Sequence, residues 1–373
     1  MLIGIPREIK NHEYLVGLTP AGVRELTAAG HQVLIEQDAG TAIGLSNEDY
    51  QQSGADIVTG SAEIFQRAEL IVKVKEPLPE VRQQLRDGQA LFTYLHLAPD
   101  PKQTRDLVNA GVIAIAYETV TDDTGGLPLL APMSEVAGRM AIQAAAHALE
   151  KPRGGMGVLI GGVPGVAPAH VIVLGGGVVG INAARMAMGL GADVTVLDKS
   201  IARLKTLDEQ FGPRLKTIYA TAESVEQAVI QADIVIGAVL LPGARSPRLI
   251  SRDMLKEMKP GAVLVDVSID QGGCFESSRP TTHDKPTYEE QGVIHYCVAN
   301  MPGAVARTST FALTNATLPF VLALANKGVN KALLDDEHLL AGLNIYRGSV
   351  TYRAVAEAHG YSFVSPETVL GED

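Results

Sequence analysis

This 373-residue chain has few cysteines, and its basic residues are fewer than its acidic residues. The two cysteines, Cys274 and Cys297, form neither a metal-ligand spacing nor a disulfide framework, so we interpret them as small buried residues in a reducing cytoplasm. There are 31 lysines and arginines against 42 aspartates and glutamates, a net charge of −11. This balance argues against nucleic acid or an anionic membrane surface as a partner.

A membrane span and a signal peptide are not expected either. Residues 1–6 contain no basic segment followed by an apolar run, as a signal peptide would require. Residues 156–184 carry no Asp, Glu, Lys or Arg, but many glycines, Pro164 and Pro168 interrupt this stretch. We therefore expect it to form a loop, a strand and a turn. A hydrophobic content of 46% over this length instead suggests two domains with large cores.

The most informative stretch is a glycine-rich turn between an apolar strand and a helix. Gly175, Gly177 and Gly180 have the G-x-G-x-x-G spacing of a dinucleotide-binding turn, and a second strand ends on Asp198 about 20 residues later. The phosphates would lie at the helix N-terminus. An acid at Asp198 would accept hydrogen bonds from the ribose hydroxyls and favour NAD over NADP. The alternative is a glycine-rich packing turn in another α/β protein.

Strands and helices alternate along most of the chain, which predicts parallel sheets covered by helices. Thr19 and Pro20 open a helix that ends before Gly30, and a long helix begins near Pro132. We expect the tail from Ser365 to be loose. The strands expected from the sequence span residues 3–6, 32–36, 70–74, 90–95, 112–117, 171–174, 193–197, 216–219, 233–239, 262–267 and 294–298.

Three of these strands lead to polar residues that suit a ligand site. Lys75 and His96 follow strands of the first domain, and Asp270 follows a strand of the second. Ligands of parallel sheets bind beyond the carboxyl ends of the strands, which places all three as candidates. The alternatives are a solvated charge for Lys75, a hydrogen-bonded structural histidine for His96 and a turn cap for Asp270.

Several motifs together resemble the NAD-dependent L-alanine dehydrogenases, a family related to the nucleotide-binding subunit of proton-translocating transhydrogenases. The resemblance covers nearly the whole chain. Residues 74–77 and the stretch around His96 favour the alanine dehydrogenase branch. The motifs lie at residues 8–14, 74–77, 93–97, 161–166, 270–273 and 300–305.

The resemblance implies a reversible reaction, L-alanine + NAD⁺ + water ⇌ pyruvate + ammonium + NADH. It implies that Lys75 holds the substrate, that His96 is the general acid/base, and that Asp270 positions water, ammonia and the amine intermediate. Ala220 stands where the family commonly has serine. The resemblance also implies a homohexamer, whose partners are only small molecules. The implied cofactor contacts are Ser134, Gly175, Gly177, Val178, Val179, Gly180, Asp198, Arg203, Ala220, Val239, Leu240, Val267, Asp270, Arg279, Val298, Asn300 and Met301.

One departure concerns substrate binding. The family has arginine directly after the motif that ends in Glu13-Tyr14, where it grips the substrate carboxylate, and this chain has Leu15. A leucine side chain cannot replace a guanidinium fork. Lys75 would then hold the carboxylate alone, or Arg7 would reach in. The alternatives are a different substrate, weak activity, or a non-catalytic NAD-binding sensor. A transhydrogenase-type subunit is a further alternative, but it would need a membrane partner.

We therefore predict an α/β protein with two Rossmann-like domains, parallel sheets around an interdomain cleft and long connecting helices. Residues 1–132 and 304–373 would form the substrate domain. Residues 133–303 would form the NAD domain, with the bridging helix at its start. Closure about hinges near Ser134 and Ala304 would exclude water from the reaction. No metal ligands are expected, and the location expected is the cytoplasm.

Overall fold

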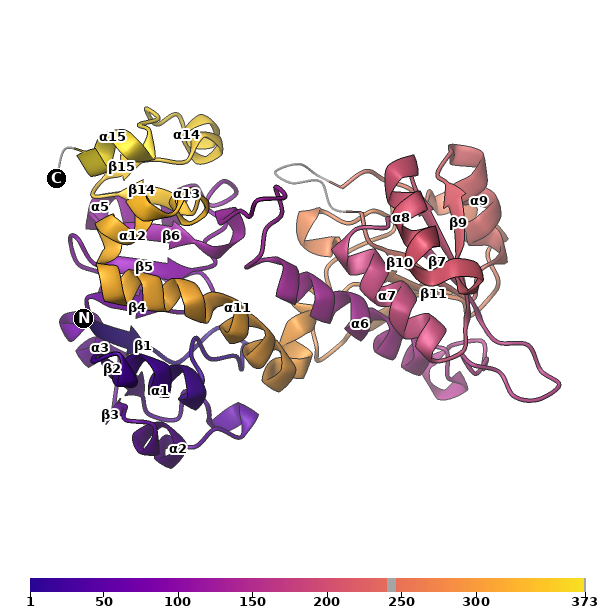
Figure 1. The fold of residues 1–373 in the computed structure, drawn as a ribbon. Coiled ribbons are helices and arrows are strands. Elements are labelled where there is room, and N and C mark those ends of the chain that lie inside the picture. Colours follow the sequence, from indigo (N-terminus) through magenta and orange to yellow (C-terminus); the bar gives the residue numbers. More distant parts are fainter. Residues whose placement is uncertain (240–245, 372–373) are drawn as a thin grey trace. The chain divides into compact units, whose positions relative to one another are not determined.

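A computed structural model describes residues 1–239 and 246–371. The chain divides into two compact units: unit 1 comprises Met1–Pro132 and Val305–Asp373, and unit 2 comprises Met133–Ala304. Each unit is a sheet covered by helices (Figure 1), so the predicted α/β fold with two Rossmann-like domains is confirmed.

Unit 1 contains an eight-stranded sheet with the order β15-β14-β6-β5-β4-β1-β2-β3 among the described residues. The six strands from β3 to β6 are parallel and follow the doubly wound order 3-2-1-4-5-6. The order reverses between β1 and β4. The strands are β1 (Leu2–Ile5), β2 (Gln32–Glu36), β3 (Asp56–Val58), β4 (Leu70–Val72), β5 (Ala90–Thr93), β6 (Ile113–Ala116), β14 (Leu343–Tyr346) and β15 (Ser349–Val350).

The helices of unit 1 begin where the sequence supplies caps. The Thr19 side chain accepts a hydrogen bond from Gly22 N–H at the start of the first helix, and Ser46 forms a capping box with Asp49 at the next. The helices are α1 (Pro20–Ala28), α2 (Asn47–Gln52), α3 (Ser61–Arg67), α4 (Pro79–Arg82), α5 (Pro101–Ala110), α11 (Ala306–Lys327), α12 (Val329–Asp335), α13 (Glu337–Leu340), α14 (Arg353–His359) and α15 (Pro366–Gly371).

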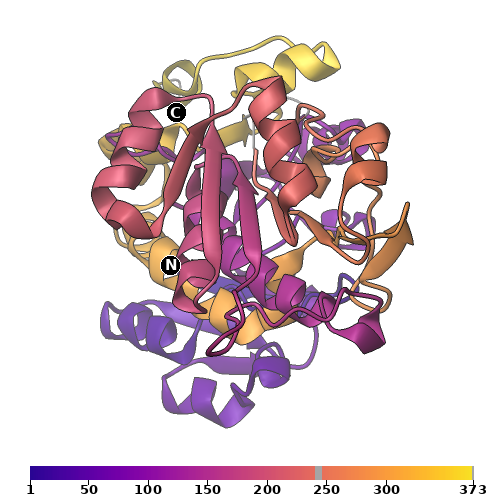
Figure 2. The ribbon, with the colours of Figure 1, turned by 90° about the vertical axis from the view of Figure 1, so that its right-hand side faces the viewer.

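Unit 2 contains a seven-stranded sheet with the order β12-β13-β11-β10-β7-β8-β9 among its described residues. Its six parallel strands again follow the order 3-2-1-4-5-6, which reverses between β7 and β10. Figure 2 shows these strands side by side with helices on both faces. The strands are β7 (His170–Leu174), β8 (Asp193–Asp198), β9 (Lys216–Tyr219), β10 (Ile234–Gly237), β11 (Val263–Asp266), β12 (Thr287–Glu290) and β13 (Val293–Tyr296).

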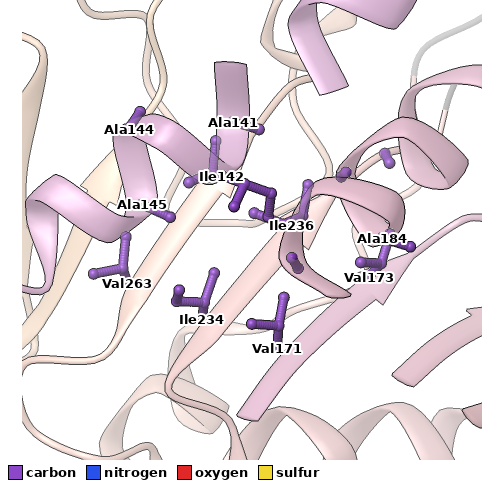
Figure 3. Close-up of a cluster of buried hydrophobic side chains, with 14 of the residues drawn as sticks. Ala141, Ile142, Ala144, Ala145, Val171, Val173, Ala184, Ile234, Ile236 and Val263 are labelled. Carbon is purple, nitrogen blue, oxygen red and sulfur yellow. The ribbon is translucent and has the colours of Figure 1, made fainter. Parts of the chain in front are cut away.

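The core of unit 2 is made by small and branched apolar side chains. Ala141, Ile142 and Ala145 on one helix lie over Ile234 and Ile236 of β10 (Figure 3), and all of them are buried. A second buried cluster covers the other face of the sheet. The helices are α6 (Ala131–Ala148), α7 (Val178–Gly189), α8 (Ile201–Phe211), α9 (Ala222–Gln231) and α10 (Arg252–Glu257).

The structure corrects two expectations. The tail beyond Ser365 is not loose: it forms α15, where Val369 and Leu370 are buried. The sheets are also not wholly parallel, because β14, β15 and β12 add antiparallel edge strands. Edge strands of this kind are common on otherwise parallel sheets.

One helical segment among the described residues, Met301–Lys327, is long and apolar enough to pass a test for a membrane span. It contains α11, which has Pro319 in its interior and buries Thr310, Thr314 and Thr317 within the protein. Its Leu318 approaches Gly22 of α1. We interpret α11 as a packing helix of unit 1. The charge-free stretch at residues 156–184 forms a loop, β7 and the start of α7, as predicted.

Candidate functional site

The turn between β7 and α7 has the geometry that a pyrophosphate needs. Gly175 has a φ of +100°, and a Cβ there would lie 2.8 Å from Ala238 O. A Cβ on Gly180 would overlap Gly175 O, so only glycine lets the helix approach the strand so closely. Gly177 is the N-cap of α7 and has no side chain to occupy the amides that follow. These amides and the helix dipole favour an anion.

Asp198 ends β8 and lies against this turn. Its Oδ2 accepts a hydrogen bond from Gly176 N–H at 2.7 Å, and its Oδ1 accepts one from Ser200 N–H at 2.8 Å. The Arg203 guanidinium donates to Gly176 O. A carboxylate offers about four acceptor positions, so Asp198 can bind a ribose hydroxyl while it holds the turn.

The remaining cofactor candidates follow neighbouring strands of unit 2. Val239, Val267 and Val298 come after β10, β11 and β13, and Ala220 comes after β9. Leu240 lies outside the described residues. Ser134 is half-buried near the start of α6, and Val178 and Val179 open α7. The topology thus gathers Ala220, Val239, Val267 and Val298 at the carboxyl edge of one sheet.

Three further candidates lie in the segment on either side of β12 and β13. The Arg279 guanidinium stacks over the Tyr288 ring, 4.1 Å from its centroid. Asn300 has a φ of +62°, and its carbonyl accepts a hydrogen bond from His283. Met301, which is buried, begins the 3₁₀ helix η6 (Met301–Val305).

Asp270 lies on the loop that leaves β11, in the short 3₁₀ helix η5 (Ile269–Gln271). The residue is exposed, and Gly272 ends the turn with a φ of +90°. The buried Asp266, the last residue of β11, accepts hydrogen bonds from this loop. The loop therefore presents Asp270 at the same edge of the sheet as the glycine turn.

In unit 1, Lys75 follows β4, where the strand order reverses. A carboxylate from the segment after β1 holds its backbone: Glu8 Oε1 accepts from Val74 N–H at 2.7 Å and from Lys75 N–H at 3.3 Å. Glu8 Oε2 pairs with the buried Lys73 Nζ at 3.0 Å. The Lys75 ammonium lies 3.8 Å from Glu13 Oε2 and remains partly exposed. Lys75 is thus a cation fixed at the switch point of the sheet.

His96 follows β5 in an unusual backbone conformation. Its φ is +50°, and its N–H donates to Glu118 Oε1 at 2.6 Å. Glu118 belongs to the 3₁₀ helix η2 (Tyr117–Thr119) and also accepts from Leu95 N–H. The imidazole of His96 stacks on the ring of Tyr94, and 53% of the His96 side chain is exposed. Burial raises the pKa of Tyr94. Positive φ is rare outside glycine and recurs at functional sites.

Leu15 lies in unit 1, in the segment between β1 and α1. Its side chain is buried, and its N–H donates to Glu13 Oε1 at 3.1 Å. Position 15 and Lys75 are therefore linked through the two oxygens of Glu13. Arg7 is exposed.

Two family models match the chain: "Alanine dehydrogenase/PNT, N-terminal domain" over residues 4–137 and "Alanine dehydrogenase/PNT, C-terminal domain" over residues 141–353. The chain belongs to the alanine dehydrogenase/PNT family. It is 62% identical to the alanine dehydrogenase of Halomonas elongata over 371 residues, which covers 100% of both chains. It is 54% identical to that of Bacillus subtilis over 374 residues, which covers 100% of this chain and 98% of the relative.

Two solved structures have the same fold. An L-alanine dehydrogenase matches 96% of this chain with a TM-score of 0.94 and 50% identity, and 99% of that protein is covered. A transhydrogenase from Sinorhizobium meliloti matches 95% of this chain and is itself covered completely, with a TM-score of 0.81 and 24% identity. At that identity, the second match supports the shared fold alone.

The sequence did not reveal the carboxylates that hold the candidate residues. Glu8 holds the backbone of Lys75, Glu118 that of His96, and Asp266 the loop of Asp270. All three carboxylates accept from backbone amides, which every residue except proline has, so no side-chain pattern marks these contacts. The available signal was position, since Glu8 and Glu118 follow parallel strands and Asp266 ends one.

Proposed function

We propose that this protein catalyses the reversible NAD-dependent oxidative deamination of L-alanine to pyruvate and ammonium. The observation that carries the proposal is 62% identity, over the full length of both chains, to an alanine dehydrogenase. A hydrolase or a purely structural role would not need a dinucleotide turn and titratable groups at the carboxyl edges of the sheets.

NAD is the cofactor that the residues of unit 2 fit. The turn at Gly175, Gly177 and Gly180 would hold the pyrophosphate, and Asp198 would accept from the ribose hydroxyls. The Asp198 carboxylate would repel the 2′-phosphate of NADP. When bound, the nicotinamide supplies the redox chemistry by exchanging hydride with the α-carbon of the substrate.

We assign the proton transfer and the binding of the substrate's charged groups to His96, Lys75 and Asp270. We assign His96 as the general acid/base that takes protons from the alanine ammonium, because an imidazole can both accept and donate a proton and this ring is accessible. The Lys75 ammonium pairs with the substrate carboxylate or polarises the keto oxygen. Asp270 stabilises the cationic iminium on the substrate and positions the water that attacks it.

In this proposal, Leu15 lowers the affinity for the substrate carboxylate. A lost charge-assisted hydrogen bond costs about 1.5–3 kcal/mol, roughly 10- to 100-fold in binding. Because the Leu15 side chain is apolar and the Lys75 ammonium is partly exposed, we assign the carboxylate to Lys75. We propose an enzyme with a raised KM for pyruvate. We further propose a cytoplasmic homohexamer that acts only on small molecules.

The test is a panel of 2-oxo acids with ammonium and NADH, followed as NADH oxidation at high substrate concentration. The proposal predicts that pyruvate gives the highest kcat/KM and that omission of ammonium abolishes the rate. If the protein binds NADH but does not oxidise it with any of the 2-oxo acids, it is the non-catalytic sensor. Hydride transfer to NADP without a 2-oxo acid would identify a transhydrogenase-type subunit.

A further inference from the structure

Asp266 is a buried carboxylate at the end of β11 whose hydrogen bonds connect it to one loop. Its Oδ1 accepts from Ser268 N–H at 3.0 Å and from the Cys274 thiol at 3.5 Å. Its Oδ2 accepts from Cys274 N–H at 2.8 Å and from the Ser278 hydroxyl. Both ends of the loop at residues 268–278 are therefore fastened to a single side chain.

The loop is shaped to reach this carboxylate. Gly273 has a φ of +76°, and a Cβ at that position would lie 2.6 Å from Asp266 Oδ2. The Ser268 hydroxyl donates to Val239 O at 2.7 Å, which ties the start of the loop to the end of β10. Ser246 N–H donates to Gln271 O at 3.2 Å. Asp270 lies between these attachments, on the exposed side of the loop.

Packing alone does not account for an acid here. Asp266 is completely buried, and burial raises its pKa despite the four donors. An apolar side chain at the end of a buried strand would avoid this desolvation cost. A carboxylate offers about four acceptor positions, enough for all four donors of the loop, whereas an amide has a single acceptor oxygen.

We infer that Asp266 is a positioning residue for the reaction, because its carboxylate fixes the loop that presents Asp270 to the substrate. The inference rests on the proposed role of Asp270 in alanine dehydrogenation. Asp266 is completely buried, so we assign it no direct contact with the substrate. Small displacements of a group that acts on the reacting atoms cost rate rather than affinity, and about 1 Å can cost roughly 100-fold.

The experiment compares Asp266→Asn with Asp233→Asn in the full-length protein. The amide introduced by Asp266→Asn would keep one acceptor oxygen and turn an NH₂ group toward two of the donors. Asp233 is the matched control: it is buried in the same unit, precedes β10 at the opposite edge of the sheet, and binds His170 N–H and Lys259 Nζ, each at 2.7 Å. Melting temperature, NADH binding, kcat and KM are measured for both.

We expect Asp266→Asn to lower kcat about tenfold or more, and Asp233→Asn to leave kcat within about twofold of the wild-type value. Ser278→Ala removes one donor and leaves the acid in place, so it reports on the loop if Asp266→Asn does not fold. We expect it to lower kcat about threefold. Equal losses of kcat in Asp266→Asn and Asp233→Asn would overturn the inference.

A double-mutant cycle with Asp270→Asn separates positioning from general destabilisation. If Asp266 acts through Asp270, then Asp266→Asn and Ser278→Ala lower kcat much less in the Asp270→Asn background. Full additivity would overturn the inference and leave the assignment of Asp270 intact. A wild-type kcat in Asp270→Asn alone would instead overturn the role proposed for Asp270.

Discussion

At the scale of single residues, the most consequential position is Leu15. Its amide and the Lys75 ammonium meet the two oxygens of the same Glu13 carboxylate, so the backbone at position 15 is linked to Lys75 through one side chain. In the proposed function, substrate affinity depends on this buried position. Leucine in place of the family's arginine removes a positive charge, while the fold is that of a solved L-alanine dehydrogenase.

We expect Leu15→Arg to lower the KM for pyruvate at least several-fold, because a guanidinium adds a charge-assisted bond to the substrate carboxylate. Without substrate, the buried cation should lower the melting temperature. Leu15→Met is the control, since it keeps volume without charge and should change KM little. An unchanged KM for pyruvate in Leu15→Arg would exclude position 15 from substrate binding.

His96 supports a second prediction at this scale. We expect His96→Gln to lower kcat by about 10²- to 10⁴-fold, the usual contribution of general acid/base catalysis, while NADH binding is unchanged. His147→Gln, at an exposed position of α6, is the matched control and should retain activity. A variant His96→Gln with near wild-type kcat would show that the histidine is only structural.

The residue types of the candidate site could be predicted from the sequence, but their supports could not. Lys75, His96 and Asp270 are predicted because each follows a strand expected to be parallel and matches a family motif, and the structure places each after a parallel strand. Glu8 pairs with Lys73 across 65 positions of the chain, a contact that local pattern does not encode. The hydrogen bond from the His96 amide to Glu118 likewise joins residues 22 positions apart.

At the scale of elements, β8 and the glycine turn act together through Asp198. Asp198→Asn would retain an oxygen for Gly176 N–H and remove the charge, so it isolates electrostatics from turn geometry. We expect the preference for NADH over NADPH, as a ratio of kcat/KM, to fall about tenfold, which corresponds to about 1.4 kcal/mol.

Asp193→Asn is the control for this prediction. Asp193 lies at the other end of β8 and forms an exposed ion pair with Lys216 at 2.7 Å. The substitution should leave the cofactor preference unchanged. If both variants shift the preference equally, Asp198 does not select the cofactor.

Elements with strong local signals were predicted well. The predicted strands at 32–36 and 216–219 coincide with β2 and β9, and Thr19 caps α1 as expected. β14, β15 and α15 were missed because they depend on distant partners: β14 pairs antiparallel with β6, and α15 buries only Val369 and Leu370. Tertiary packing decides such short edge elements.

At the scale of the whole molecule, stability should depend on pH through the buried His295 in β13. Its Nδ1 lies 3.0 Å from Val293 O and its Nε2 lies 2.7 Å from the Ser277 hydroxyl, so the neutral ring donates from Nδ1 and accepts at Nε2. Burial lowers its pKa to about 4. The unfolded chain thus binds the proton more readily than the folded protein does.

The stabilisation by neutral His295 is therefore complete above pH 6.5 and is lost as the pH falls from 6.5 toward 4. The loss amounts to about 3 kcal/mol at most. We expect His295→Gln to be less stable at neutral pH and to show a flatter decline of melting temperature over this range. His147→Gln should keep the wild-type slope. Parallel curves for His295→Gln and the wild type would exclude this titration.

The central claim is that this chain converts alanine to pyruvate with NAD. The most direct measurement incubates the purified protein with L-alanine and NAD⁺ and quantifies NADH, pyruvate and ammonium together. We predict equal amounts of the three products, formed at a rate that His96→Gln abolishes. NADH formed without matching pyruvate and ammonium, or no NADH even at saturating L-alanine, would contradict the claim.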